Sequence, residues 1–247
     1  MNENKSYSLK YNYKVNSADT DIEGRLKMGA LLNFLIQSAI NSSNKLGFGF
    51  DEIKEESLFW VLSRISIEIN RPILWNEEIT VETWPKNIEK ILYLRDFIVR
   101  DKNENVIAKS TSGWLAINSE TKRPHLSQHI NTETYYTLKD KHALKEVPKK
   151  IMPIKVGDKF SVKPTFFDID INRHVTSTRY LDWMMDTYDL DFLLKNYPTK
   201  ISINYIKETK PSENVGIVRN NKSDNKYIFE GKHINSNIVT FRGIIEF

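Results

Sequence analysis

The sequence predicts an α+β fold made of two copies of one unit, in which a long helix is wrapped by an antiparallel sheet. Two apolar segments of helical character, residues 26–46 and 175–197, are each followed by runs of alternating apolar and polar residues. An acidic motif precedes each segment, and Asp170 follows Asp21 by 149 residues, as Asp168 follows Asp19. Self-similarity at a fixed spacing indicates an internal duplication.

The first copy begins with segment 26–46, whose apolar residues cover most of its circumference. We therefore expect a helix that is buried nearly all round and that stops at Gly47. The alternation is strict in SRISIEIN, where Ile65 and Ile67 share one face. The strands predicted after this helix are residues 63–70, 79–84, 91–101 and 106–118, with a hairpin turn at 101–105.

The second copy has the same order. Its helix, residues 175–197, ends before Pro198, and strands are predicted at 200–208 and 215–220, followed by a hairpin at 226–247. A single long apolar helix wrapped by an antiparallel sheet is the hotdog arrangement, so the sequence predicts a double hotdog with its two sheets joined into one. A fold of this kind does not by itself define a function.

We divide the chain into an N-terminal hotdog (residues 1–130), a linker (131–155) and a C-terminal hotdog (156–247). The linker carries a cluster of lysines, is punctuated by Pro148 and Pro153, and shows no apolar period. A flexible basic linker could also meet an acidic partner.

Composition excludes several classes of protein. The 247 residues include no cysteine, which rules out disulfides, thiolate metal ligands and a cysteine nucleophile within this sequence. A net charge of +4 without a concentrated basic stripe does not indicate nucleic-acid binding. No apolar stretch reaches the length of a membrane span, and no targeting segment is evident, so we expect a cytoplasmic protein.

Three polar residues form the first candidate site. Asp170, Asn172 and His174 stand at alternate positions before the second helix, and in an extended segment they would point the same way. The free N–H groups at the helix start would favour negative charge at that point. Helix capping is the alternative explanation for any one of them. The first copy has Glu23 and Arg25 in place of Asn172 and His174, so we expect one active site rather than two.

Glu208 is the next candidate, at the end of the alternating run 200–208. From the pattern alone, an exposed carboxylate at a strand end is the favoured explanation.

The segment DIDINRHVTSTRYLDW resembles the signature D-x-D-x-N-x-H-V-N-N-x-x-Y-x-x-W of the acyl-acyl-carrier-protein thioesterases of plants and bacteria. The segments FWVLSRISIEINRPILWNEEITVETW and LRDFIVRDKNENVIAKSTSGWLAIN are similar to the N-terminal strands of the same family. The resemblance covers nearly the whole chain. It implies a hydrolase that cleaves the thioester between a fatty acyl chain and a carrier protein, releasing free fatty acid.

The resemblance also implies site residues. Asp170, Asn172 and His174 match the signature, and the family's Glu-Cys pair falls on Glu208 and Thr209, so the glutamate is kept and the cysteine is not. The Asn-Asn pair of the signature is replaced by Thr176 and Ser177. We expect Thr176 and Thr209 to contact the substrate.

A mechanism by direct attack of water follows as a hypothesis. Glu208 or His174 accepts the proton of the water, Asn172 and a backbone N–H polarise the thioester carbonyl, and Asp170 orients Asn172 or His174. Thr209 is a weaker candidate as a nucleophile because threonine needs an unusually well-placed base. The remaining histidines show no metal-ligand spacing, so we expect neither a metal nor a cofactor.

The first hotdog lacks the polar trio but keeps a strongly apolar helix, so Leu31, Phe34 and Leu35 are expected to bind the acyl chain, although core packing is the favoured explanation for any one of them. The expected partner is an acyl carrier protein. A thioesterase acting on acyl-coenzyme A and a non-enzymatic acyl-binding hotdog are the alternatives. The oligomeric state stays open, with a homodimer as one arrangement.

Overall fold

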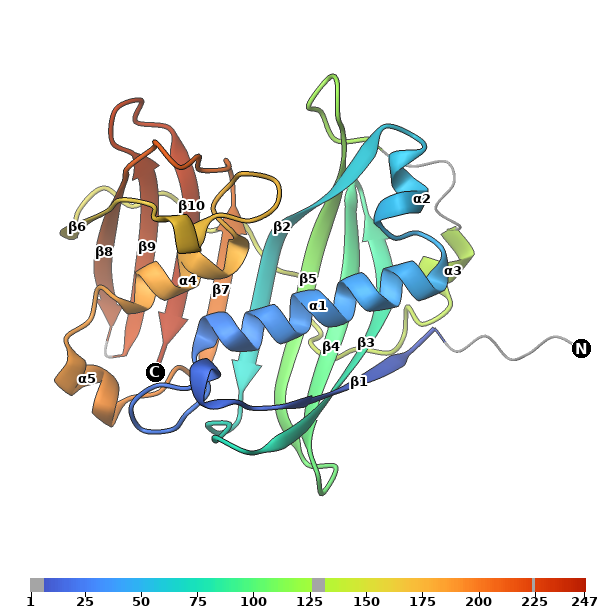
Figure 1. Ribbon diagram of the computed structural model, residues 1–247, viewed down its shortest axis with the longest axis horizontal. Coiled ribbons are helices and arrows are strands. Elements are labelled where there is room, and N and C mark those ends of the chain that lie inside the picture. The colour runs from blue at the N-terminus through green and yellow to red at the C-terminus, as the bar shows by residue number, and fades with distance from the viewer. Residues whose placement is uncertain (1–6, 126–131, 224) are drawn as a thin grey trace, which may run out of the picture.

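A computed structural model describes residues 7–125, 132–223 and 225–247. It contains one ten-stranded antiparallel sheet in the order β1-β3-β4-β5-β2-β7-β10-β9-β8-β6 (Figure 1). The strands are β1 (Leu9–Lys14), β2 (Leu58–Ile69), β3 (Glu78–Glu89), β4 (Leu92–Asp101), β5 (Val106–Asn118), β6 (Asp158–Val162), β7 (Lys200–Tyr205), β8 (Val215–Ser223), β9 (Lys226–His233) and β10 (Val239–Glu246). The helices are η1 (Ser17–Asp19), α1 (Met28–Leu46), α2 (Phe50–Lys54), α3 (Thr132–Tyr136), η2 (Phe166–Asp168), α4 (Ser177–Met185) and α5 (Leu190–Lys195).

The structure confirms the double hotdog. The spacing of 149 residues seen at the aspartates also separates the starts of β1 and β6, of η1 and η2, and of α1 and α4. Outward from β2 the strands follow in the order β5, β4, β3, β1, and outward from β7 their equivalents follow in the order β10, β9, β8, β6. The chain is therefore two structurally equivalent halves related by a pseudo-twofold axis.

The two halves join where β2 pairs with β7. The register places Ser66 opposite Ser202, and their hydroxyl oxygens are 3.0 Å apart. Ile65 and Ile67 of β2 and Ile201 and Ile203 of β7 are buried on the face that supports the helices. One hydrophobic core runs across this junction, so the two sheets form a single continuous layer.

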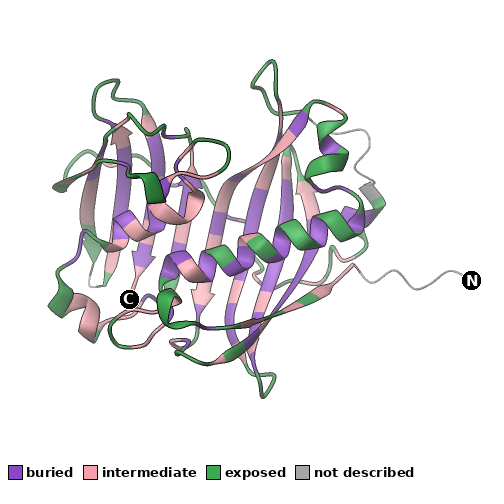
Figure 2. Cartoon of the chain, viewed as in Figure 1, coloured by how far each residue is buried: buried purple, intermediate pink, exposed green. Residues whose placement is uncertain are grey.

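Helix α1 differs from the expectation that it is buried nearly all round. Asn33, Gln37, Asn41 and Asn44 are exposed, and Figure 2 shows the side of α1 that faces away from the sheet in green. The opposite side packs on the sheet. Among the described residues no second layer covers the outer face of this amphipathic helix, so its polar side chains meet water. It ends as expected at Gly47, whose φ of 84° is the left-handed conformation typical of a helix terminus.

The second helical segment is broken into α4 and α5, so the prediction of one helix over 175–197 was wrong. The Thr187 hydroxyl donates to the Met184 carbonyl at 2.7 Å where α4 ends. Tyr188 turns inward at the break and packs against Phe192, Tyr227 and Phe247. Burial of this aromatic ring offsets the helical hydrogen bonds that are lost.

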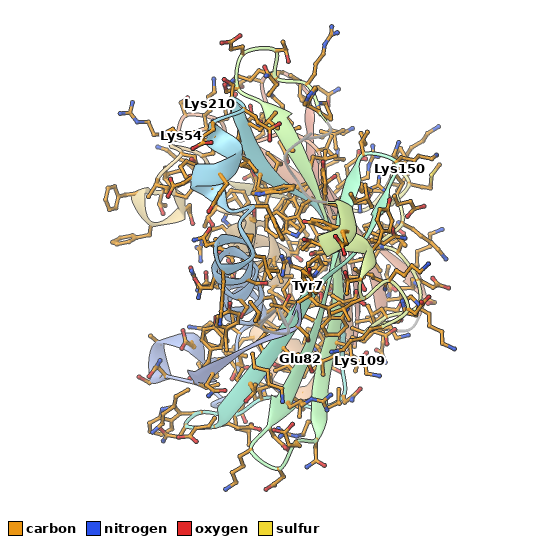
Figure 3. The ribbon with its side chains drawn as sticks, turned by 90° about the vertical axis from the view of Figure 1, so that its right-hand side faces the viewer. Tyr7, Lys54, Glu82, Lys109, Lys150 and Lys210 are labelled. Carbon is orange, nitrogen blue, oxygen red and sulfur yellow. The ribbon has the colours of Figure 1, made fainter. Side chains whose placement is uncertain are left out.

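Residues 137–156, which we call the strap, cross the face of the sheet opposite the helices. In Figure 3 Lys150 lies on the other side of the sheet from α1. Strap backbone groups bind sheet side chains of both halves: the Ala143 N–H donates to Asp96 Oδ2 at 2.7 Å and the Ile151 N–H to Asn204 Oδ1 at 2.7 Å. The strap is therefore tied to β4 and β7. The boundary expected between residues 130 and 131 lies outside the described residues.

None of the described helices combines the length and the apolar character that crossing a bilayer requires.

Candidate active site

The loop before α4 is not extended, so the alternate-spacing argument for Asp170, Asn172 and His174 was wrong. Ile169 and Val175 form an antiparallel bridge, and the chain turns back between them. The Asp170 N–H donates to the His174 carbonyl and the Arg173 N–H to the Asp170 carbonyl, both at 2.9 Å. Arg173 has a φ of 62°, so the segment is a tight turn.

Asp170 shapes this turn. Its Oδ1 accepts the N–H of Asn172 at 2.8 Å and the N–H of His174 at 3.4 Å. The first half has the same arrangement, in which Asp21 Oδ1 accepts the N–H of Glu23 and the N–H of Arg25, both at 2.9 Å. Asp170 thus acts on Asn172 and His174 through their backbones. Because Asp21 does the same in the half without the amide and imidazole, this role belongs to the repeated unit.

His174 and Glu208 lie on two segments that are joined at one rim of the C-terminal half. The Val175 N–H donates to the Thr209 carbonyl at 2.8 Å, which joins the turn to the chain that leaves β7. His174 immediately precedes Val175, and Glu208 immediately precedes Thr209. The two residues also interact electrostatically, because the charge of His174 contributes to lowering the pKa of Glu208.

The pKa of Glu208 is the outcome of opposing effects. Partial burial raises it, but the hydrogen bond from Lys207, with Nζ and Oε1 2.8 Å apart, and the charges of Lys207 and His174 bring it below its ordinary value. Glu208 is therefore ionised at neutral pH. Its side chain is 46% exposed, so the bond with Lys207 is a weak surface pair that a substrate can displace.

Asn172 is exposed on the turn and His174 is half-buried. Within the described residues no hydrogen bond engages the Asn172 side chain, so its amide is free to donate to a substrate. Thr176 precedes α4 as the cap residue, and its N–H donates to the Asp168 carbonyl at 2.9 Å. Its side chain is half-buried and does not cap the helix.

Thr209 lies behind the rim and has no exposed surface. Its N–H donates to the Tyr180 hydroxyl at 3.1 Å, and its Oγ1 lies 3.2 Å from His233 Nε2. Burial raises the pKa of Tyr180 to about 12, so this phenol stays protonated. This placement makes Thr209 a support for the two segments that carry Glu208 and Val175. The expected substrate contact requires a hydroxyl at the surface, and Thr209 does not present one.

His233 is a residue that sequence reasoning missed. It is 4% exposed at the end of β9, and its Nε2 faces both Thr209 Oγ1 and Glu213 Oε2, the latter at 3.4 Å. A catalytic triad needs the carboxylate and the hydroxyl on different ring nitrogens, so this cluster is a support and not a nucleophile with its base. His233 follows Thr209 by 24 residues and lies in β9, so no sequence pattern pointed to the cluster.

The three residues expected to bind the acyl chain are packed in the core. Leu31, Phe34 and Leu35 are 0%, 9% and 1% exposed on the side of α1 that faces the sheet. The space under α1 is not uniformly apolar, because buried Arg95 donates to Ser42 Oγ at 2.9 Å. In the part of the chain that the structure describes, no cluster of side chains is suited to hold a metal ion.

Solved structures with this architecture define the class as a double hotdog of thioesterase type. An acyl-ACP thioesterase from Bacteroides thetaiotaomicron superposes with a TM-score of 0.90 at 26% identity, covering 97% of each chain. The 12:0-ACP thioesterase from Umbellularia californica shares the fold, with a TM-score of 0.86 at 19% identity over 98% of this chain and 97% of that one.

Family models lead to the particular family. The acyl-ACP thioesterase N-terminal domain matches residues 6–135 and the acyl-ACP thioesterase C-terminal domain matches residues 151–245. The chain belongs to the acyl-ACP thioesterase family.

Two plant relatives from Arabidopsis thaliana are similar in sequence. The chain is 23% identical to oleoyl-acyl carrier protein thioesterase 2 over 240 residues, which are 90% of this chain and 65% of that protein. It is 23% identical to palmitoyl-acyl carrier protein thioesterase over 213 residues, 81% of this chain and 52% of that protein. The chain thus spans between about half and two thirds of the length of these relatives.

Proposed function

We propose that this chain hydrolyses the thioester that links a fatty acyl chain to an acyl carrier protein, and that water is the nucleophile. The observation that carries the proposal is the Val175–Thr209 bond, which joins the segments of His174 and Glu208 at one rim, in a chain of the acyl-ACP thioesterase family. Because the sequence holds no cysteine, a cysteine acyl-enzyme within this chain is excluded.

In the proposed reaction, a water molecule attacks the thioester carbonyl while Glu208 or His174 accepts its proton. Ionised Glu208 can take that proton, and a positioned base contributes about 10²–10⁴-fold in rate. The carbonyl oxygen becomes negative in the tetrahedral intermediate. When the carbon–sulfur bond breaks, the proton passes to the thiol of the carrier's prosthetic arm, and the products are a fatty acid and the free carrier.

The developing negative charge needs donors that are in place beforehand. The exposed amide of Asn172 is one, and the first N–H groups of α4 are others because they have no partner inside the helix. Removing one such donor typically lowers the rate by about 10²–10³-fold. Asp170 serves this arrangement by holding the turn that carries Asn172 and His174.

We assign the chemistry to residues 156–247 and the acyl chain to residues 1–130. The assignment is supported by Glu23 and Arg25, which occupy the positions of Asn172 and His174 in the first half and leave it without an amide and imidazole. The acyl chain then lies along the apolar side of α1, which requires the packed side chains of Leu31, Phe34 and Leu35 to move apart.

Hydrolysis of carrier-bound acyl chains, followed by mass spectrometry of the released acids, tests the proposal. We expect His174→Ala and Glu208→Gln to lower kcat by at least 100-fold, with His142→Ala and Glu120→Gln as matched controls at wild-type rates. Near-wild-type rates for either test variant would remove that residue from the mechanism. Faster turnover of the coenzyme A thioester of the same acyl chain would instead favour acyl-coenzyme A as substrate. Binding of the acyl chain without release would indicate a non-enzymatic acyl-binding protein.

A further inference from the structure

Three large apolar side chains project into solvent beside the candidate site. Phe166, Phe167 and Ile171 are 87%, 86% and 98% exposed, and we call them the apolar tip. The two phenylalanine rings contact each other edge to face, with centroids 5.6 Å apart. The segment that carries η2, gold in Figure 1, lies on the side of the sheet that carries the helices. Exposed apolar groups that cluster in this way mark interaction surfaces.

The fold does not require the aromatic pair of the apolar tip. At the equivalent positions, 149 residues earlier, η1 carries Ser17 and Ala18 in place of the two phenylalanines. Both short helices have the same capping arrangement, with Asn16 and Asp19 in the first and Thr165 and Asp168 in the second. The same backbone therefore forms without aromatic residues, and the aromatic pair occurs only in the half that carries His174.

The position of the tip links it to the site. Ile171 lies between Asp170 and Asn172 on the turn, and the N–H of Thr176 binds the carbonyl of Asp168, which ends η2. Whatever covers the tip therefore sits directly beside the turn that carries Asn172 and His174. A substrate delivered by a macromolecule must bring that macromolecule to this place.

Three cations lie on the segments next to the tip. Lys163 precedes η2, Arg173 follows Ile171 on the turn, and Lys210 follows Thr209, and all three are exposed. Among the residues that the structure describes, none of these three side chains forms an ion pair, whereas the nearby Lys207 is paired with Glu208. Unpaired cations around an apolar centre fit an acidic protein partner, because the charges steer the encounter and the buried aromatic groups hold the complex.

We propose that the apolar tip and its three cations are the docking surface for the carrier protein, an acidic helical protein that delivers the acyl thioester. This inference rests on the proposed function and names the surface that recognises the protein part of the substrate. A lipid surface is less well matched, since interfacial binding uses an extended amphipathic helix and η2 has three residues.

The test converts the tip into its counterpart from the first half, by the double substitution Phe166→Ser and Phe167→Ala. We expect kcat/KM for acyl-carrier protein to fall at least tenfold, mainly through KM. Turnover of the same acyl chain on pantetheine, which lacks the protein, should stay within twofold of wild type. Ile22→Ser, a change at the equivalent of Ile171 in the first half, is the matched control and should leave both substrates unaffected.

Four outcomes would overturn the inference. Equal losses on both substrates would show that the tip acts on the reaction itself, and no loss on either would show that the carrier docks elsewhere. If kcat/KM on the carrier substrate is unchanged but the variant no longer binds phosphatidylglycerol vesicles, the tip belongs to a membrane contact. If kcat/KM is unchanged but a dimer is lost in sedimentation, the tip belongs to a contact with a second copy. If wild type hydrolyses neither substrate, the proposed function itself fails, a result distinct from an active but insensitive variant.

Discussion

Replacing His233 with leucine tests whether the buried contact between His233 and Thr209 holds together the rim that carries His174 and Glu208. The imidazole Nε2 lies 3.2 Å from Thr209 Oγ1, and the carbonyl of Thr209 in turn accepts the N–H of Val175 at 2.8 Å. This series of contacts connects β9 to both Glu208 and His174. Loss of the imidazole should therefore affect stability and catalysis together.

The expected cost follows from burial. Thr209 has no exposed surface, so without His233 its hydroxyl loses a partner that water cannot replace, at about 1–3 kcal/mol. Glu213 is 35% exposed and stays hydrated, so it adds little. In a chain of this size each kcal/mol lowers Tm by roughly 2–4 °C. His233→Gln, whose amide nitrogen can take the place of Nε2, should retain most of the stability and most of kcat.

A double-mutant cycle separates this contact from general damage to the core. Thr209→Val removes the other partner, and with both partners apolar the unpaired hydroxyl disappears. We expect the double variant to cost at least ~1 kcal/mol less than the sum of the single variants, measured by urea unfolding with tryptophan fluorescence. We also expect its kcat to be no lower than that of the worse single variant. Additive costs, or unchanged kcat in His233→Leu, would refute the supporting role.

Three further predictions use the repeated loops, the rim carboxylate and the core behind it. Asp21→Ala and Asp170→Ala should each destabilise the chain by about 1–3 kcal/mol in urea unfolding, because both carboxylates satisfy two backbone N–H groups, but only Asp170→Ala should lower kcat. When kcat is measured against pH, it should fall on the acid side only below pH 4.5, the ordinary pKa of glutamate, because the neighbouring lysine outweighs burial and lowers the pKa of Glu208. An inflection above pH 4.5, or an inflection that survives in Glu208→Gln, would exclude Glu208 as the base. Gly231→Ala should cost about 1–3 kcal/mol in thermal or urea unfolding, because a Cβ there would lie 2.1 Å from the fully buried ring of Phe241; unchanged stability would show that the ring can move.

Patterns that repeat along the chain predicted the fold well. The alternation in residues 63–70 appears as the buried isoleucines of β2, and the strand predicted at 106–118 coincides with β5. Strands β1 and β6 were not predicted, because they have only six and five residues and no position that is fully buried, so their apolar pattern is short and weak. Helix α1 was predicted to be apolar around most of its circumference, but polar residues recur along one side of it, where they meet water.

The candidate site was predicted only in part, because its geometry depends on contacts between distant segments. The motif before α4 identified Asp170, Asn172 and His174, but it folds as a tight turn that Asp170 closes through backbone bonds. The relation of Glu208 to this turn depends on one backbone bond that no spacing reveals. His233 reaches Thr209 across 24 residues of unrelated sequence, so only the folded chain shows it.

The junction between β2 and β7 also determines how the molecule behaves at high concentration. Two separate five-stranded sheets would have four open edges able to recruit strands from other molecules, whereas in the described chain the joined sheet has two, at β1 and β6. These strands have six and five residues and carry exposed Lys10, Lys14 and Lys159. Short, lysine-bearing edges disfavour strand addition, so the fused sheet itself protects the protein from edge-to-edge aggregation.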